Sequence, residues 1–164
     1  MDFQFFPIDV TYETNINGKA AIQLFGRTLN GEKVCIIDPD FEPYFYVIPK
    51  TQDNIIKLVE QINQVSFIQD TIRYFVTKTE VVKKKILRRE IEVIRVFVNH
   101  PSAVPELRRE IKSINNVLET READLLFVRR YLIDKEIAPT ALTEVKGDII
   151  ERNDLNVDLV IRAN

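Results

Sequence analysis

The sequence predicts an α+β protein, in which an antiparallel β-meander is followed by a split βαβ arrangement and a β-rich C-terminal tail. Two observations indicate this fold. Asn-Gly pairs separate apolar runs near the start of the chain, and two segments with helical spacing of apolar residues lie between β-rich runs further along. The 164 residues are 45% hydrophobic and 29% charged, which is ordinary for a folded domain.

The meander is expected to occupy the beginning of the chain. The runs "IDVTYETN", "KAAIQLFGRT" and "EKVCIID" read as strands, and they are separated by Asn17-Gly18 and Asn30-Gly31. An Asn-Gly pair tolerates the positive φ of a two-residue hairpin turn, so we expect such turns at both places. "DPDFEP" then forms a turn-rich connector.

The split βαβ arrangement is expected over residues 44–122. "PYFYVI" reads as an aromatic strand and residues 52–64 as a helix, and two further strands are joined by the basic tip 83–89. Ser102 is expected to cap a second helix. The apolar positions of that helix share one face: Val104, Leu107, Ile111 and Ile114. With "NVLETRE" as the last strand, this order is that of ferredoxin-like folds.

A third helix and more strands are expected at the C-terminal end. "DLLFVRRYLIDKE" has helical spacing, with Asp124 as its candidate cap. Residues 140–164 are expected to form two or three strands about Lys146-Gly147.

Composition excludes several classes of protein. The net charge of -2 gives no global basic field, so any site for a polyanion has to be a local patch. Cys35 and His100 are the only residues of their types, which excludes a disulfide scaffold or a zinc cluster. Cys35 lies in an apolar run and is expected to be a small core residue. We recognise no signal peptide or membrane span and expect a cytoplasmic location.

The sequence also lacks catalytic motifs. Its four glycines are scattered and form no phosphate-binding loop. Asp38 and Asp40 flank a proline and are better explained as turn acids than as metal ligands. His100 precedes Pro101, which favours an extended residue leading into a helix. We therefore expect no catalytic site, metal site or cofactor in this chain.

Basic residues form two groups whose role the pattern alone leaves open. They either cover solvated faces, protect a hairpin edge from pairing, or contact the phosphates of a nucleic acid. The hairpin-tip group is Lys83, Lys84, Lys85, Arg88 and Arg89, and the group near the last two helices is Arg108, Arg109, Arg121, Arg129 and Arg130.

Four segments resemble motifs of one known domain. "IDVTY", "FEPYFYVI", "NHPSAVPELRREI" and "FVRRYLIDKEI" resemble, in order and at comparable spacings, motifs of the amino-terminal domain of archaeal family B DNA polymerases. The resemblance covers about Ile8 to Glu136. It implies that residues 1–139 are such a domain, with 44–122 as its ferredoxin-like subdomain. Residues 140–164 would be a β-rich segment leading toward an exonuclease domain that is absent here.

This resemblance implies a function in DNA replication. The parent would be a replicative DNA-directed DNA polymerase with a 3′–5′ exonuclease that uses Mg²⁺, whereas this chain would carry neither active site. The domain would bind single-stranded template and survey it for uracil and other deaminated bases. Its partners would be template DNA and the remaining polymerase domains, in cis or as a separate chain.

The resemblance also implies the residues of a base pocket. Arg108 and Arg130 would support the pocket or contact neighbouring phosphates. Leu126 and Ala103 depart from the family pattern, which often has proline and a polar residue at these places. The residues that would line the pocket are Tyr12, Pro43, Val104, Pro105, Leu125 and Phe127.

Two other interpretations remain. The domain could only brace the polymerase and exonuclease modules, with no DNA affinity of its own. Alternatively, it could be a stand-alone ferredoxin-like RNA-binding or regulatory module, in which Tyr44 and Tyr46 share a strand face and stack on bases. The run "REIEVIRVFV" lacks the Gly-aromatic pattern of the RNA-recognition motif, which counts against the second alternative.

Overall fold

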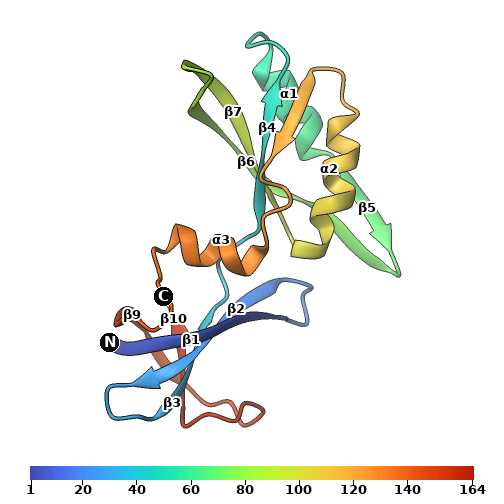
Figure 1. The fold of residues 1–164 in the computed structure, drawn as a ribbon. Coiled ribbons are helices and arrows are strands. Elements are labelled where there is room, and N and C mark those ends of the chain that lie inside the picture. The colour runs from blue at the N-terminus through green and yellow to red at the C-terminus, as the bar shows by residue number, and fades with distance from the viewer. The chain divides into compact units, whose positions relative to one another are not determined.

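The computed structural model describes residues 1–164, which form two compact units (Figure 1). The barrel unit contains residues 1–41 and 126–164, and the sheet unit contains residues 42–125. The fold is α+β, with two five-stranded sheets and three α-helices. The sheet unit contains the predicted 44–122 segment.

The barrel unit is a closed five-stranded barrel with strand order β1-β2-β3-β10-β9 and one helix. Its elements are β1 (Asp2–Thr14), β2 (Ala20–Thr28), β3 (Lys33–Asp38), α3 (Phe127–Asp134), β9 (Thr143–Ile150) and β10 (Leu159–Ala163). Inward-facing side chains of the strands, among them Phe5, Ile22 and Ile36, form its core together with Phe127 and Tyr131 of α3. The meander predicted from the sequence is present as β1, β2 and β3, which pair antiparallel in order.

The turns of the meander differ from those expected. The N–H of Asn15 donates to the carbonyl of Lys19, and the N–H of Gly18 donates to the carbonyl of Asn15. The loop therefore has three residues, with only Gly18 at positive φ, and Gly31 ends a similar loop. The prediction of two-residue turns was wrong, because a glycine in the left-handed region also suits the last position of a three-residue loop.

The tail closes the barrel and does not turn at Lys146-Gly147. Gly147 lies inside β9, where it pairs with Ala163 of β10. A Cβ at this position would overlap the carbonyl oxygen of Arg162, so glycine allows the close approach of the two strands. The predicted pair of strands in this tail is confirmed, but the strands are not divided at Lys146-Gly147, because an isolated glycine also marks close backbone approach inside a strand.

The sheet unit is a five-stranded sheet of order β5-β6-β7-β4-β8. Its elements are β4 (Tyr44–Pro49), α1 (Ile55–Asn63), β5 (Ser66–Gln69), β6 (Ile72–Ile86), β7 (Arg89–Val98), the 3₁₀ helix η1 (Pro101–Ala103), α2 (Val104–Lys112) and β8 (Val117–Arg121). Leu58 of α1 and Leu107 of α2 pack with Val47 and Ile94 in one core, so both helices cover the same face of the sheet (Figure 1). The predicted strands and helices of this segment are confirmed, with β5 in addition.

Two helix starts differ from the prediction. The Nδ1 of His100 accepts a hydrogen bond from the backbone N–H of Ser102 at 3.1 Å, so the histidine caps η1 and Ser102 is not the cap. Asp124 does not cap α3, which begins at Phe127. Its N-cap residue is Leu126, and no side chain accepts a capping hydrogen bond there. The first helical segment therefore begins earlier than predicted, at Pro101, and α3 begins later, at Phe127. No helix is long and apolar enough to cross a membrane.

Candidate nucleic-acid interface

The residues assigned to the base pocket are distributed over both units. The barrel unit holds Tyr12, Phe127 and Arg130, and the sheet unit holds Pro43, Val104, Pro105, Leu125 and Arg108. The contacts of these residues are therefore described for each unit by itself.

In the barrel unit, three aromatic residues meet at the start of α3. The rings of Tyr12 and Phe127 lie edge to face with centroids 5.6 Å apart, and Phe41 stacks on Phe127 at 5.5 Å. Phe127 is buried, whereas Tyr12 is 38% exposed and offers ring surface to solvent. Phe41 was not assigned to the pocket, although it is the first residue of the motif "FEPYFYVI".

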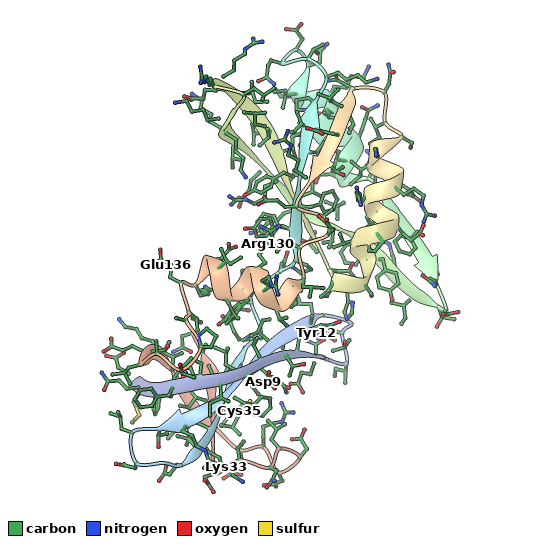
Figure 2. The ribbon with its side chains drawn as sticks, viewed as in Figure 1. Asp9, Tyr12, Lys33, Cys35, Arg130 and Glu136 are labelled. Atoms are coloured by element: carbon green, nitrogen blue, oxygen red, sulfur yellow. The ribbon has the colours of Figure 1, made fainter.

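Arg130 lies one turn after Phe127 in α3 (Figure 2) and is only 4% exposed. A guanidinium with so little exposure has lost most of its hydration. This low exposure leaves little of the guanidinium for contact with a phosphate, and the support of the pocket by Arg130 stays a prediction.

Tyr131, the next residue, binds one of the candidate turn acids. Its hydroxyl donates a hydrogen bond of 2.9 Å to Oδ2 of Asp38, and burial together with the Asp38 charge raises the pKa of Tyr131. The other oxygen of Asp38 accepts the backbone N–H of Asp40 at 3.2 Å. This is the local bond of a turn acid, as predicted. No group of three or more His, Cys, Asp or Glu side chains is placed to hold a metal ion.

In the sheet unit, His100 and Pro101 lead into the first turn of α2. Val104 is 9% exposed and belongs to the core of the unit, while the next residue, Pro105, is exposed. Proline fits the first turn of a helix, because the N–H that it lacks would have no partner within the helix. His100 thus has the structural role that the sequence predicted, although as a capping side chain.

The two arginines of α2 have different environments. Arg108 lies one turn after Val104 and is half-buried, and its Nε donates to Oγ1 of Thr120 on β8 at 2.9 Å. Arg109 is exposed and forms an ion pair with Glu106 at 2.9 Å. The bond to Thr120 holds the guanidinium of Arg108 in place and leaves its two terminal nitrogens for another acceptor.

The remaining assigned residues of this unit are positioned by the backbone. The carbonyl of Pro43 accepts the N–H of Val98 at 3.0 Å, and Leu125 is half-buried after β8. The two departures from the family pattern differ in exposure, since Ala103 is fully buried and Leu126 is 65% exposed. A polar residue in place of Ala103 would have to be accommodated in the core, so alanine suits this chain at that position.

Comparison with known proteins shows homology to archaeal DNA polymerases. No family model matches the sequence. The DNA polymerase of Methanocaldococcus jannaschii is 43% identical over 132 residues, which are 80% of this chain. That of Thermococcus sp. strain 9oN-7 is 38% identical over the same share. The chain is homologous to the archaeal family B DNA polymerases. The family B polymerase of Pyrobaculum calidifontis has a solved structure that matches 98% of the chain with a TM-score of 0.81 and 25% identity.

The homology concerns a small part of each polymerase. The chain spans 8% of the M. jannaschii protein, 16% of the Thermococcus protein and 20% of the P. calidifontis chain. It therefore corresponds to a portion of a family B DNA polymerase, and the resemblance seen in the sequence motifs is confirmed.

Proposed function

We propose that the chain is the amino-terminal domain of a replicative family B polymerase, which binds single-stranded template and surveys it for uracil and other deaminated bases. The observation that carries the proposal is the contact between Tyr12 and Phe127. These residues come from two separate family motifs, far apart in the sequence, and both belong to the set assigned to base recognition. Their rings form one aromatic surface that is partly open to solvent.

The chemistry of this surface suits a base that has left its stack. Stacking on an aromatic side chain contributes about 1–3 kcal/mol per base and tolerates any base. Discrimination then requires a wall that excludes the methyl group of thymine and a donor aimed at O4 that rejects the amino group of cytosine. Apolar side chains supply such a wall in base pockets, and main-chain amides supply the donor. The sheet unit contributes its own assigned apolar residues, Val104 and Pro105, to the proposed function.

Arg108 supports the same function from the sheet unit. Its guanidinium is oriented by Thr120, and an oriented arginine is well suited to bind a phosphate or to brace a recognition residue. The strand order β6-β7-β4-β8, with α1 and α2 on one face, supports a ferredoxin-like assignment for this unit.

The catalytic work would lie elsewhere in the polymerase. We propose that primer extension, 3′–5′ proofreading and the Mg²⁺ ions that they use belong to other domains, joined in cis or present as a separate chain. The chain would contribute template recognition and no cofactor.

The proposal is tested by fluorescence-anisotropy titration of the purified chain with matched uracil- and thymine-containing single strands at one fixed salt concentration. A tenfold to hundredfold preference for uracil is expected, since rejection of one methyl group is worth about 1–3 kcal/mol in a shaped pocket. Equal affinities would refute base survey but leave template binding, and no binding to either strand would favour the bracing role.

The RNA-binding alternative is less favoured by the side chains of the sheet face. Tyr46 is only 6% exposed, and the Nζ of Lys84 lies 3.5 Å from the centre of its ring. Arg95 also donates to the Tyr46 hydroxyl at 3.2 Å. A base could stack on Tyr46 only after these contacts were broken.

A further inference from the structure

The β6–β7 hairpin carries a basic end that lies outside the residues assigned to template recognition. Its strands pair from Val76 opposite Val98 as far as Ile86 opposite Arg89. The pairing of β4 with β7 ends at Val47 opposite Ile94. Beyond that point the hairpin continues as a two-stranded ribbon, which projects from the sheet in Figure 1.

The charge of this end is concentrated. Residues 83–89 contain five cationic side chains and no acid, although the whole chain has a net charge of -2. Lys83 pairs with Glu90 at 4.0 Å and Lys84 with Glu122 at 3.5 Å. The other three cations, Lys85, Arg88 and Arg89, are exposed and lie outside these ion pairs.

The turn of the hairpin has large side chains at two positions whose backbone conformation favours glycine. Leu87 and Arg88 form a two-residue turn with φ values of 50° and 65°. Both lie in the left-handed region, which is unfavourable for residues with a Cβ. The chain places glycine at positive φ in its two meander turns, yet here it has a leucine that is 91% exposed and an arginine. Six other non-glycine residues also have positive φ, among them Asp70 and Thr71 of the β5–β6 turn, so the distinguishing feature of this tip is its exposed leucine between cations.

We propose that the end of the β6–β7 hairpin binds a nucleic-acid duplex, separately from the single-strand site. A two-stranded ribbon fits the major groove of a duplex, which is about 12 Å wide. Lys85, Arg88 and Arg89 then contact the phosphates on either side, and Leu87 at the tip contacts the apolar parts of the bases and sugars.

The test compares three proteins by anisotropy titration with a short labelled DNA duplex over a series of salt concentrations. The first is the wild-type chain, and the second carries Lys85→Ala, Arg88→Ala and Arg89→Ala. The third is a control with the same loss of charge at exposed lysines of the same unit: Lys50→Ala, Lys57→Ala and Lys112→Ala.

We expect the hairpin variant to bind the duplex at least about tenfold more weakly at low salt. The slope of log affinity against log salt should become shallower by about 2.7 if all three residues contact phosphate, at about 0.9 per contact. The control should keep most of the affinity. Equal losses in the two variants, or duplex binding unaffected by the hairpin changes, would overturn the proposal.

The variant Leu87→Ala tests the apolar contact in the groove separately from the charge contacts with phosphate. Because leucine releases no counterion, its loss should weaken duplex binding by a few-fold and leave the salt slope unchanged. An unchanged affinity would overturn the groove contact. Single-strand affinity should be the same in the hairpin variant as in the wild type, so failure of this proposal is distinguishable from failure of the template-binding function.

Discussion

Tyr12 of β1 contacts Phe127, the first residue of α3, edge to face at a centroid distance of 5.6 Å. The contact joins the first strand of the barrel to a helix that follows the whole sheet unit in the sequence. Phe127 is held in turn by Phe41, so the orientation of the exposed Tyr12 ring is set by packing beneath it. A ring that is already ordered loses little side-chain entropy when a base stacks on it.

The first prediction concerns that ring. Tyr12→Ala should weaken binding of single-stranded DNA by about 1–3 kcal/mol, the usual contribution of base stacking, which is roughly five- to 150-fold. Phe25→Ala is a matched control, because Phe25 is a half-buried aromatic residue of the same unit that packs against the Cys35 cluster, which is separate from the cluster of Phe127. Anisotropy titration measures both variants, and equal losses would remove Tyr12 from the site.

The second prediction concerns Val104. A longer polar side chain at this position should fill space that a uracil would need, so Val104→Gln should abolish the preference for uracil and retain ordinary single-strand binding. Val81→Gln is the control, since Val81 is 47% exposed on β6.

The structure adds a condition to this experiment. Val104 is 9% exposed and packs in the core of the sheet unit, so the glutamine should also lower the free energy of unfolding by about 1–3 kcal/mol. Thermal unfolding therefore has to establish that the variant is folded at the titration temperature. A folded variant that still prefers uracil would contradict the assignment of Val104.

The third prediction distinguishes the two arginines of α2. Arg108→Ala should weaken single-strand binding, and the salt slope should become shallower by about 0.7 if Arg108 contacts a phosphate. Arg109→Ala should change neither quantity appreciably, because Arg109 is exposed and paired with Glu106 on the helix surface. If the two variants behave alike, Arg108 has no special role.

Much of the fold was predictable because its determinants are local. The helical spacing of Ile55, Leu58 and Ile62 and the alternation of the strands gave the correct elements in the correct order. The wrong loop length assigned to both Asn-Gly turns has a local cause as well, because an Asn-Gly pair fits both a two-residue and a three-residue hairpin loop. The cap by His100 was not predictable, since histidine is not among the preferred capping residues.

The candidate site was predictable only through the resemblance. Nothing in the local sequence of Tyr12 indicates that it meets Phe127, because that contact depends on the barrel that β9 and β10 complete. The barrel is closed by the parallel pairing of β3 with β10, two strands far apart in the sequence, and no local sequence pattern predicts such a pairing. For the same reason Phe41 and the bond between Tyr131 and Asp38 were found only in the structure.

The fourth prediction tests whether Asp38 is structural. Tyr131→Phe removes the hydroxyl that donates to Asp38 and should lower the free energy of unfolding by about 1.5–3 kcal/mol, the usual range for a hydrogen bond to a charged group. In a double-mutant cycle with Asp38→Asn, measured by urea unfolding, the two changes should be non-additive.

An activity assay tests the same point. Neither the wild-type chain nor the Asp38→Asn variant is expected to extend primers or degrade DNA with Mg²⁺. Reproducible nuclease activity in the wild type that Asp38→Asn abolishes would contradict this structural role.

The fifth prediction concerns Cys35, which is fully buried beside Ala21, Ile37 and Val160. Burial, reinforced by the charge of Glu13, raises the pKa of the thiol from 9.0 to about 12. The folded protein therefore holds the neutral thiol at a pH where the unfolded chain already ionises. Stability from this group is fully present below pH 9 and is lost as the pH rises from 9 toward 12.

Urea unfolding of the wild type and of Cys35→Ala at several pH values checks this expectation. Lysine and tyrosine titrations affect both proteins, so the difference between them isolates the thiol. That difference should decrease by up to about 1.4 kcal/mol per pH unit above pH 9. A thiol reagent should likewise label Cys35 only after denaturant is added, because a buried neutral thiol is unreactive. A pH-independent difference together with rapid labelling of the native protein would mean that β3 opens readily and exposes Cys35 to solvent.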